Sequence, residues 1–126
     1  MLLIDANAIL RYTLNDNHDM ATKVRELISK SKLYVRYEVM AEVVYVLSKV
    51  YSLPRVEITD GIRIFLSCDN VETESKEVLD SALETFSTTK MDFVDCILLG
   101  FKRVYGYDVF TFDKKLNKLL QTGKNG

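Results

Sequence analysis

Four acidic residues spread along the chain are the side chains best suited to carry out chemistry. They are Asp5, Glu42, Asp95 and Asp113. A ligand set made of oxygen atoms alone selects a hard divalent cation, so these residues predict a site for Mg²⁺ or Mn²⁺. An ion held in this way can orient a phosphate group, activate a water molecule and stabilise a leaving oxygen.

The elements that must position these carboxylates follow from the hydrophobic pattern, in which short apolar runs alternate with longer helical periods. Strands are predicted at residues 2–4, at 33–35, around Val71 and at 109–112. Helices are predicted over 8–14, 18–31, 39–51, from Pro54 to about Phe65, over 78–86 and 92–104, and from Asp113 onward. This alternation is typical of a parallel α/β sheet with right-handed crossovers, whose ligands bind beyond the carboxyl ends of the strands.

These elements are expected to bring the four carboxylates to one edge of the sheet. Asp5 and Asp113 directly follow strands, and Asp95 lies in the first turn of a helix that starts from the same edge. Glu42 is predicted to lie on the apolar stripe of its helix, where a charged side chain is costly unless it is paired or binds metal. That stripe is formed by Val39, Val43, Val46 and Val50.

Each acidic residue also has an explanation that involves no metal. Asp5, Asp92 and Asp113 are each placed to cap a helix N-terminus. Asp95 would then occupy the third helical position, where the helix dipole favours a negative charge. Glu42 could extend from the flank of its helix into solvent. The joint occurrence of four carboxylates without an obvious basic partner for each favours the metal site.

Length and composition indicate the number of domains, the state of the cysteines and the cellular location. A chain of 126 residues with 48% hydrophobic and 28% charged side chains is expected to form a single domain, residues 1–126. Cys68 and Cys96 form no CxxC pair and, with His18 as the one histidine, cannot build a usual structural zinc site, so both are expected to be reduced core residues. The opening residues do not resemble a signal peptide and no apolar run is long enough to span a membrane, so a cytoplasmic location is expected.

Four segments of the chain resemble the motifs of PIN-domain ribonucleases, and in particular of VapC-like toxins. They are residues 3–12 (LIDANAILRY), 42–47 (EVVYVL), 92–99 (DFVDCILL) and 111–116 (TFDKKL). The resemblance covers essentially the whole chain, in matching order and spacing. It implies a parallel sheet of about five strands flanked by helices in three α/β/α layers, one strand more than the hydrophobic pattern locates.

The same resemblance implies a function and a set of site residues. The function is that of a Mg²⁺- or Mn²⁺-dependent endoribonuclease, a homodimer inhibited by a small antitoxin protein. The acidic positions of the family match Asp5, Glu42, Asp95 and Asp113, and its supporting polar positions match Asn7, Asp92 and Thr111. The chain departs from its relatives after Asp113, where lysines replace the aromatic residue that often follows the acid.

Basic and apolar side chains suggest two further surfaces. Arg36, Lys114, Lys115 and Lys118 are predicted to contact RNA phosphates, with an ordinary solvated helix face as the alternative for the lysines. Net charge is −1 overall, but residues 92–126 carry six basic and four acidic side chains. The predicted fourth helix carries Ile58, Ile62, Phe65 and Leu66, an apolar surface that is expected to support dimerisation.

The sequence argues against three other functions. A phosphoacceptor receiver domain needs a phosphorylatable Asp after a central strand and a Lys after the last one, whereas the second strand here ends at Arg36 and the fourth at Asp113. A haloacid-dehalogenase-type phosphatase needs a second Asp where Asn7 stands. A non-catalytic PIN-like module that binds RNA or serves as a scaffold has no need to keep all four acids.

Overall fold

The computed structural model describes residues 1–123, which form two compact units. The first unit comprises residues 1–76 and the second begins at Glu77. No helix in the described residues is long and apolar enough to cross a membrane.

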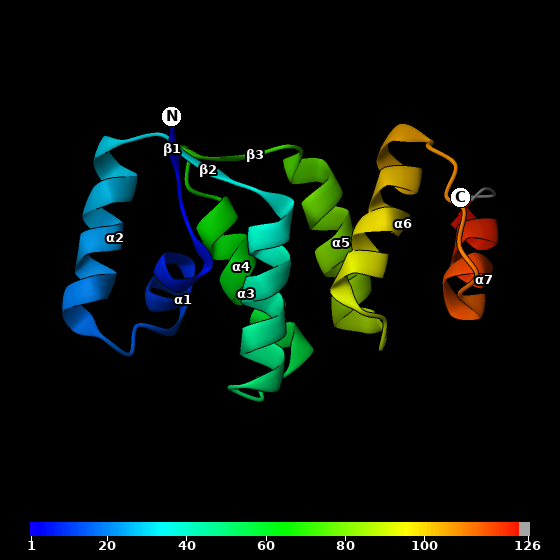
Figure 1. The fold of residues 1–126 in the computed structure, drawn as a ribbon, viewed down its shortest axis with the longest axis horizontal. Helices are drawn as coiled ribbons and strands as arrows, with labels where there is room; N and C mark the ends of the chain where they lie inside the picture. Colours follow the sequence, from blue (N-terminus) through cyan, green and yellow to red (C-terminus); the bar gives the residue numbers. More distant parts are fainter. Residues whose placement is uncertain (124–126) are drawn as a thin grey trace. The chain divides into compact units, whose positions relative to one another are not determined.

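The first unit contains three strands and four helices, in the order that the hydrophobic pattern predicts (Figure 1). They are β1 (Leu2–Leu3), α1 (Ala6–Leu14), α2 (His18–Lys30), β2 (Leu33–Val35), α3 (Tyr37–Lys49), α4 (Arg55–Leu66) and β3 (Val71–Thr73). Local signals set several of these boundaries. The side chain of Asn17 accepts a hydrogen bond from the Met20 amide at the start of α2, and Pro54 immediately precedes α4.

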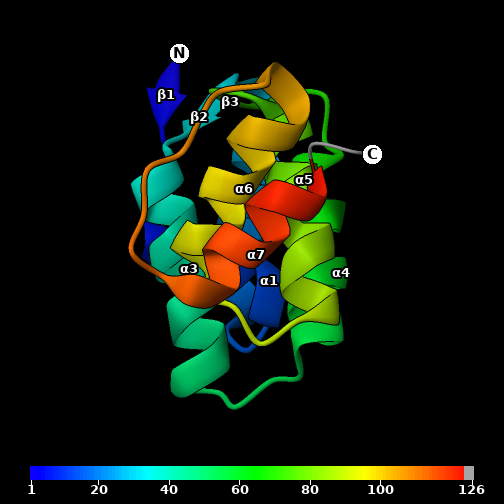
Figure 2. The ribbon, with the colours of Figure 1, turned by 90° about the vertical axis from the view of Figure 1, so that its right-hand side faces the viewer.

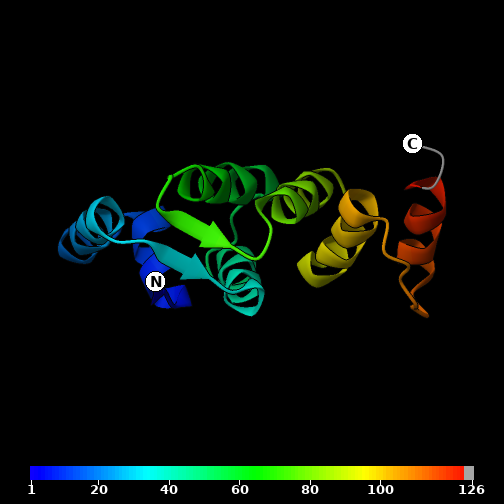
Figure 3. The same ribbon diagram turned by 90° about the horizontal axis from the view of Figure 1, so that it is seen from above.

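The sheet of this unit is parallel, with β2 between β1 and β3. Figure 3 shows β2 and β3 side by side, and Figure 1 shows α1, α3 and α4 extending to the same side of the strands. Leu33, Val35 and Val71 are fully buried. The predicted parallel sheet flanked by helices is therefore confirmed.

Helix α4 buries the residues that were expected to form a surplus apolar surface. Ile58, Ile62, Phe65 and Leu66 are all buried. The ring of Phe65 meets that of Tyr12 edge to face, with centroids 5.4 Å apart. The interpretation of these side chains as a dimer surface is therefore wrong, because α1 within the same unit already covers part of this face.

The second unit contains α5 (Lys76–Thr88), whose first residue ends the first unit, α6 (Phe93–Tyr105) and α7 (Lys114–Gly123). Gly100 lets α6 approach α5 closely, since a Cβ atom there would lie 2.9 Å from the carbonyl oxygen of Val78. Helix α6 ends at Gly106 in the left-handed conformation, with φ of 72°, as the sequence predicts. Helices α6 and α7 lie side by side (Figure 2).

The predicted fourth strand, residues 109–112, is not a strand. Phe110 and Phe112 are 86% and 89% exposed. Their rings meet each other edge to face, with centroids 5.3 Å apart. A strand exists only where its backbone pairs with a neighbour, and this segment pairs with none in residues 1–123. The described chain thus has three strands where about five were expected, and the three-layer order stays a prediction.

The two cysteines are free, as predicted. Cys96 is buried, but Cys68 is only half-buried and lies 3.8 Å from the hydroxyl oxygen of Tyr12. Only Cys96 therefore matches the expected core residue fully.

Candidate functional site

Asp5 stands at the junction between β1 and α1. Its Oδ1 atom accepts a hydrogen bond of 2.9 Å from the backbone amide of Ala8, so it caps α1. The residue is exposed, and so is Asn7 two positions later. Capping uses one carboxylate oxygen and leaves the other facing solvent, where a cation can reach it.

Glu42 lies in the second turn of α3 and is exposed, which corrects the prediction that it lies on a core-facing stripe. The buried face of α3 is formed by Met40, Val43, Val44 and Leu47, whereas Val39 and Val46 are half-buried and Val50 is exposed. The helix is thus rotated relative to the predicted stripe, and the argument from a costly buried charge does not apply. Among the described residues, the Glu42 carboxylate forms no hydrogen bond or ion pair.

Asp95 lies in the first turn of α6 and is half-buried. Burial raises its pKa above the ordinary value, and the nearby charges of Asp113 and then Asp92 raise it further. Helices α6 and α7 both begin at the lower end of the second unit in Figure 1, so Asp113 at the start of α7 lies near enough to act on Asp95. Asp92 is exposed and occupies the N-cap position of α6 without a capping side-chain bond.

Two hydrogen bonds hold Asp113 at the start of α7, and a third holds its neighbour Thr111. Its Oδ1 atom accepts from the Leu116 amide at 2.7 Å, and its own amide donates to Oγ1 of Thr111 at 3.0 Å. The side-chain amide of Asn117 donates to the carbonyl oxygen of Thr111 at 2.9 Å. Thr111 therefore positions the backbone of Asp113. Asn117, which the sequence analysis missed, secures Thr111 from one turn along the helix.

The structure divides the predicted acidic residues between its two units. Asp5 and Glu42 belong to the first unit, and Asp92, Asp95 and Asp113 belong to the second. Within residues 1–123, no three His, Cys, Asp or Glu side chains are gathered closely enough to hold a metal ion. The donor set nevertheless fits a hard cation, because it is oxygen-only and because Asp95 carries like-charge repulsion that a bound cation would relieve.

The residues predicted to contact RNA differ in whether an acidic side chain already pairs with them. Arg36 forms an ion pair with Glu38 that lowers the pKa of Glu38 and raises that of Arg36. Lys114, Lys115 and Lys118 are exposed on α7 and form no ion pair with the residues that the structure describes. The lysines are thus the better placed to meet phosphate groups.

Comparison with known proteins agrees with the motifs. Residues 2–119 match the PIN domain family. The chain is 27% identical over 124 residues to a VapC ribonuclease of Aquifex aeolicus (strain VF5), an alignment that covers 94% of this chain and 92% of that protein. No solved structure matches the chain significantly. Since the family match spans nearly the whole sequence, the chain belongs to the PIN domain family.

Proposed function

We propose that the protein is a VapC-like endoribonuclease that depends on Mg²⁺ or Mn²⁺. The observation that carries this proposal is the electrostatic environment of Asp95, whose carboxyl is half-buried and faces the charges of Asp113 and Asp92. Perturbed acids of this kind are typical of functional sites. The similarity to a VapC ribonuclease adds the reaction class.

Asp5, Glu42, Asp95 and Asp113 are the residues that would hold the ion. When bound, the ion supplies positive charge to the phosphate oxygens and activates water for attack on phosphorus. Asp5 and Asp113 each use one oxygen for capping, which fixes the orientation of the other. Glu42 and Asp95 have no hydrogen-bond partner among the described residues, so both of their oxygens are available.

Three polar residues would support this site. Thr111 holds the backbone of Asp113, and Asp92 adds negative charge near Asp95. Asn7 is exposed in the first turn of α1, between Asp5 and Ala8, whose amide Asp5 caps. The exposed lysines of α7 lie within five residues after Asp113 and would contact the phosphates of the RNA. Arg36 would contact RNA phosphates only in competition with its ion pair to Glu38.

Two protein partners are part of the proposal. An antitoxin would inhibit the enzyme, as expected for a VapC-like toxin, and a second copy would form a homodimer. The homodimer now rests on the family resemblance, because the apolar residues of α4 are buried. Light scattering at micromolar concentration tests it, and a monomer would contradict it. A cytoplasmic location likewise stays a prediction.

The decisive experiment is cleavage of a labelled single-stranded RNA by the purified protein with Mn²⁺, with Mg²⁺ and with EDTA. We expect cleavage with either ion and none with EDTA. The variant Asp95→Asn should be inactive under all conditions, whereas Asp19→Asn, at an exposed position in the first turn of α2, should cleave like the parent. Cleavage of equal rate in EDTA would rule out the metal-dependent mechanism.

A further inference from the structure

The second unit carries a cluster of aromatic rings that the proposed chemistry does not use. The rings of Phe101, Tyr105 and Tyr107 surround the turn at Gly106, where α6 ends. Phe101 and Tyr107 are nearly parallel, with an interplanar angle of 8° and centroids 6.0 Å apart. Tyr105 and Tyr107 stack at 5.5 Å with an angle of 26°. The three rings therefore form one packed cluster.

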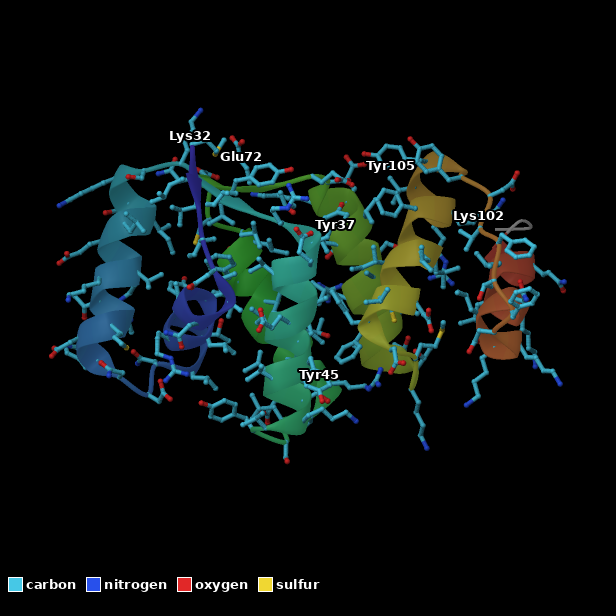
Figure 4. All side chains as sticks on the ribbon, viewed as in Figure 1. Lys32, Tyr37, Tyr45, Glu72, Lys102 and Tyr105 are labelled. Atoms are coloured by element: carbon cyan, nitrogen blue, oxygen red, sulfur yellow. The ribbon has the colours of Figure 1, made fainter. Side chains whose placement is uncertain are left out.

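Two of these rings are exposed, and Phe101 is half-buried. Tyr105 and Tyr107 are 50% and 59% exposed. Tyr105 lies at the C-terminal end of α6 (Figure 4). Their hydroxyl groups form no hydrogen bond with the residues that the structure describes. Exposed tyrosines with free hydroxyls offer an apolar face and a polar edge together, which is the combination that an unpaired nucleobase also presents.

A hollow of about 420 Å³ lies beside the cluster. It is lined by Leu98, Phe101, Tyr107, Asp108, Val109 and Phe110. Its volume lies in the range of small-molecule sites, and its walls are mostly aromatic and aliphatic. The carboxylate at its rim, Asp108, is paired with the ammonium of Lys102 at 3.0 Å, so the rim does not carry an uncompensated negative charge that would repel a phosphate.

The part of the sequence that contains the hollow is rich in basic residues, which suits a polyanion. Residues 96–123 contain five basic side chains and two acidic ones. The basic residues are Lys102, Arg103, Lys114, Lys115 and Lys118. Proteins that bind single-stranded nucleic acid combine such positive charge with aromatic rings on which bases stack. A purely apolar protein partner would make no use of either the lysines or the free hydroxyl groups.

We propose that this hollow receives an unpaired base of single-stranded RNA, stacked on Tyr107. The proposal rests on the proposed function and extends it, because it assigns a substrate-positioning site outside the carboxylates. Tyr107 and its neighbours would select unpaired RNA over duplex RNA, since only an unpaired base can leave its stack to reach an aromatic face.

The chain contains no tryptophan, which allows a direct test. The variant Tyr107→Trp places one fluorophore in the proposed site and is titrated with hexauridylate in EDTA, so that no metal-dependent cleavage occurs. We expect saturable quenching of its emission. The matched control is Tyr45→Trp on α3, where the parent side chain is 63% exposed and lies in the first unit (Figure 4). Its emission should change little.

Binding of labelled hexauridylate then measures the contribution of the ring. Tyr107→Ala should raise Kd about fivefold or more, whereas Tyr107→Phe should keep it within about twofold, because stacking needs the ring and not the hydroxyl. Tyr45→Ala should behave like the parent. Equal affinity of Tyr107→Ala and the parent would overturn the proposal.

Two other results would also overturn it. Equal quenching of Tyr107→Trp by inorganic polyphosphate would mean that only phosphate groups are bound. A change in its emission with protein concentration, in the absence of RNA, would identify the cluster as an interface between copies of the chain. The test is separable from the proposed function. Binding of RNA without cleavage in Mn²⁺ would contradict the proposed ribonuclease activity and support the base-binding site. Cleavage without quenching would support the activity and contradict the base-binding site.

Discussion

Burial raises the pKa of Asp95 in the first turn of α6, and the carboxylate of Asp113, at the start of α7, raises it further. The two residues are distant in sequence, and each has a local reason to stand at a helix N-terminus. Their proximity is a property of how α6 and α7 lie side by side within the second unit. Like charges held together in this way store repulsion that protonation, mutation or a cation can relieve.

The raised pKa of Asp95 makes the stability of the metal-free protein depend on pH. Because its folded-state pKa lies above its unfolded-state value, the stabilising contribution is complete below the unfolded pKa and is lost as pH rises through the folded pKa. Asp95→Asn should therefore raise Tm at neutral pH in EDTA, and this gain should shrink as pH falls toward 4. A gain in Tm that is constant with pH would show that ionisation of Asp95 is not its cause.

Asp5→Asn should separate catalysis from folding. An asparagine oxygen can still accept the hydrogen bond from Ala8, so α1 keeps its cap and Tm should stay close to that of the parent. Cleavage should be lost, because a neutral amide is a much poorer ligand for a hard cation. Asp5→Ala, which loses the cap as well, should also lower the free energy of unfolding by about 1 kcal/mol. If Asp5→Asn cleaves RNA like the parent, Asp5 is a cap and not a ligand.

Adding Mn²⁺ to the metal-free protein should raise Tm in a concentration-dependent manner, because an ion that binds only the folded state stabilises it. The same increase should be absent in Asp95→Asn.

Products of cleavage should carry a 5′-phosphate and a 3′-hydroxyl, since water is the expected nucleophile. Mass spectrometry that finds 2′,3′-cyclic phosphate ends would instead identify the 2′-hydroxyl of the RNA as the nucleophile.

Replacing Lys114, Lys115 and Lys118 together by glutamine should weaken RNA binding and flatten its dependence on salt. For single strands each phosphate contact contributes about 0.7 to the slope of log K against log salt, so the slope should fall by about 2. Anisotropy with labelled hexauridylate at several salt concentrations measures it. A matched triple variant at three exposed lysines of the first unit, Lys23, Lys30 and Lys32, should change the slope less. Equal slopes for both variants would mean that the α7 lysines form an ordinary solvated helix face and do not contact RNA.

Gly100→Ala should destabilise the second unit. The new Cβ atom would lie 2.9 Å from the carbonyl oxygen of Val78, and a backbone atom cannot move aside as a side chain can. We expect a loss of about 1–3 kcal/mol in urea unfolding. Gly106→Asn serves as the control, because no atom lies within 4 Å of its Cβ position and asparagine tolerates the left-handed conformation. A smaller loss in the free energy of unfolding for Gly100→Ala than for Gly106→Asn would contradict the close packing of α5 and α6.

Features that depend on neighbours in sequence could be predicted from the sequence alone. Helix caps at Asp5 and Asp113, the helix end at Gly106 and the alternation of helices with three parallel strands all appear in the structure as expected. Their hydrogen bonds close within a few residues, so local chemistry determines them. The four acidic motifs also identified the family from sequence.

Features that depend on partners far away in the chain were decided by the tertiary structure. Residues 109–112 have the composition of a strand but lack a paired neighbour in the described chain, and a strand cannot form without one. The apolar residues of α4 could not be assigned to core or dimer surface until α1 was seen to pack on them, and the helical period alone did not reveal the rotation that leaves Glu42 exposed. The repulsion between Asp95 and Asp113 likewise arises only when two helices meet, because an electrostatic interaction depends on distance in space and not on separation along the chain.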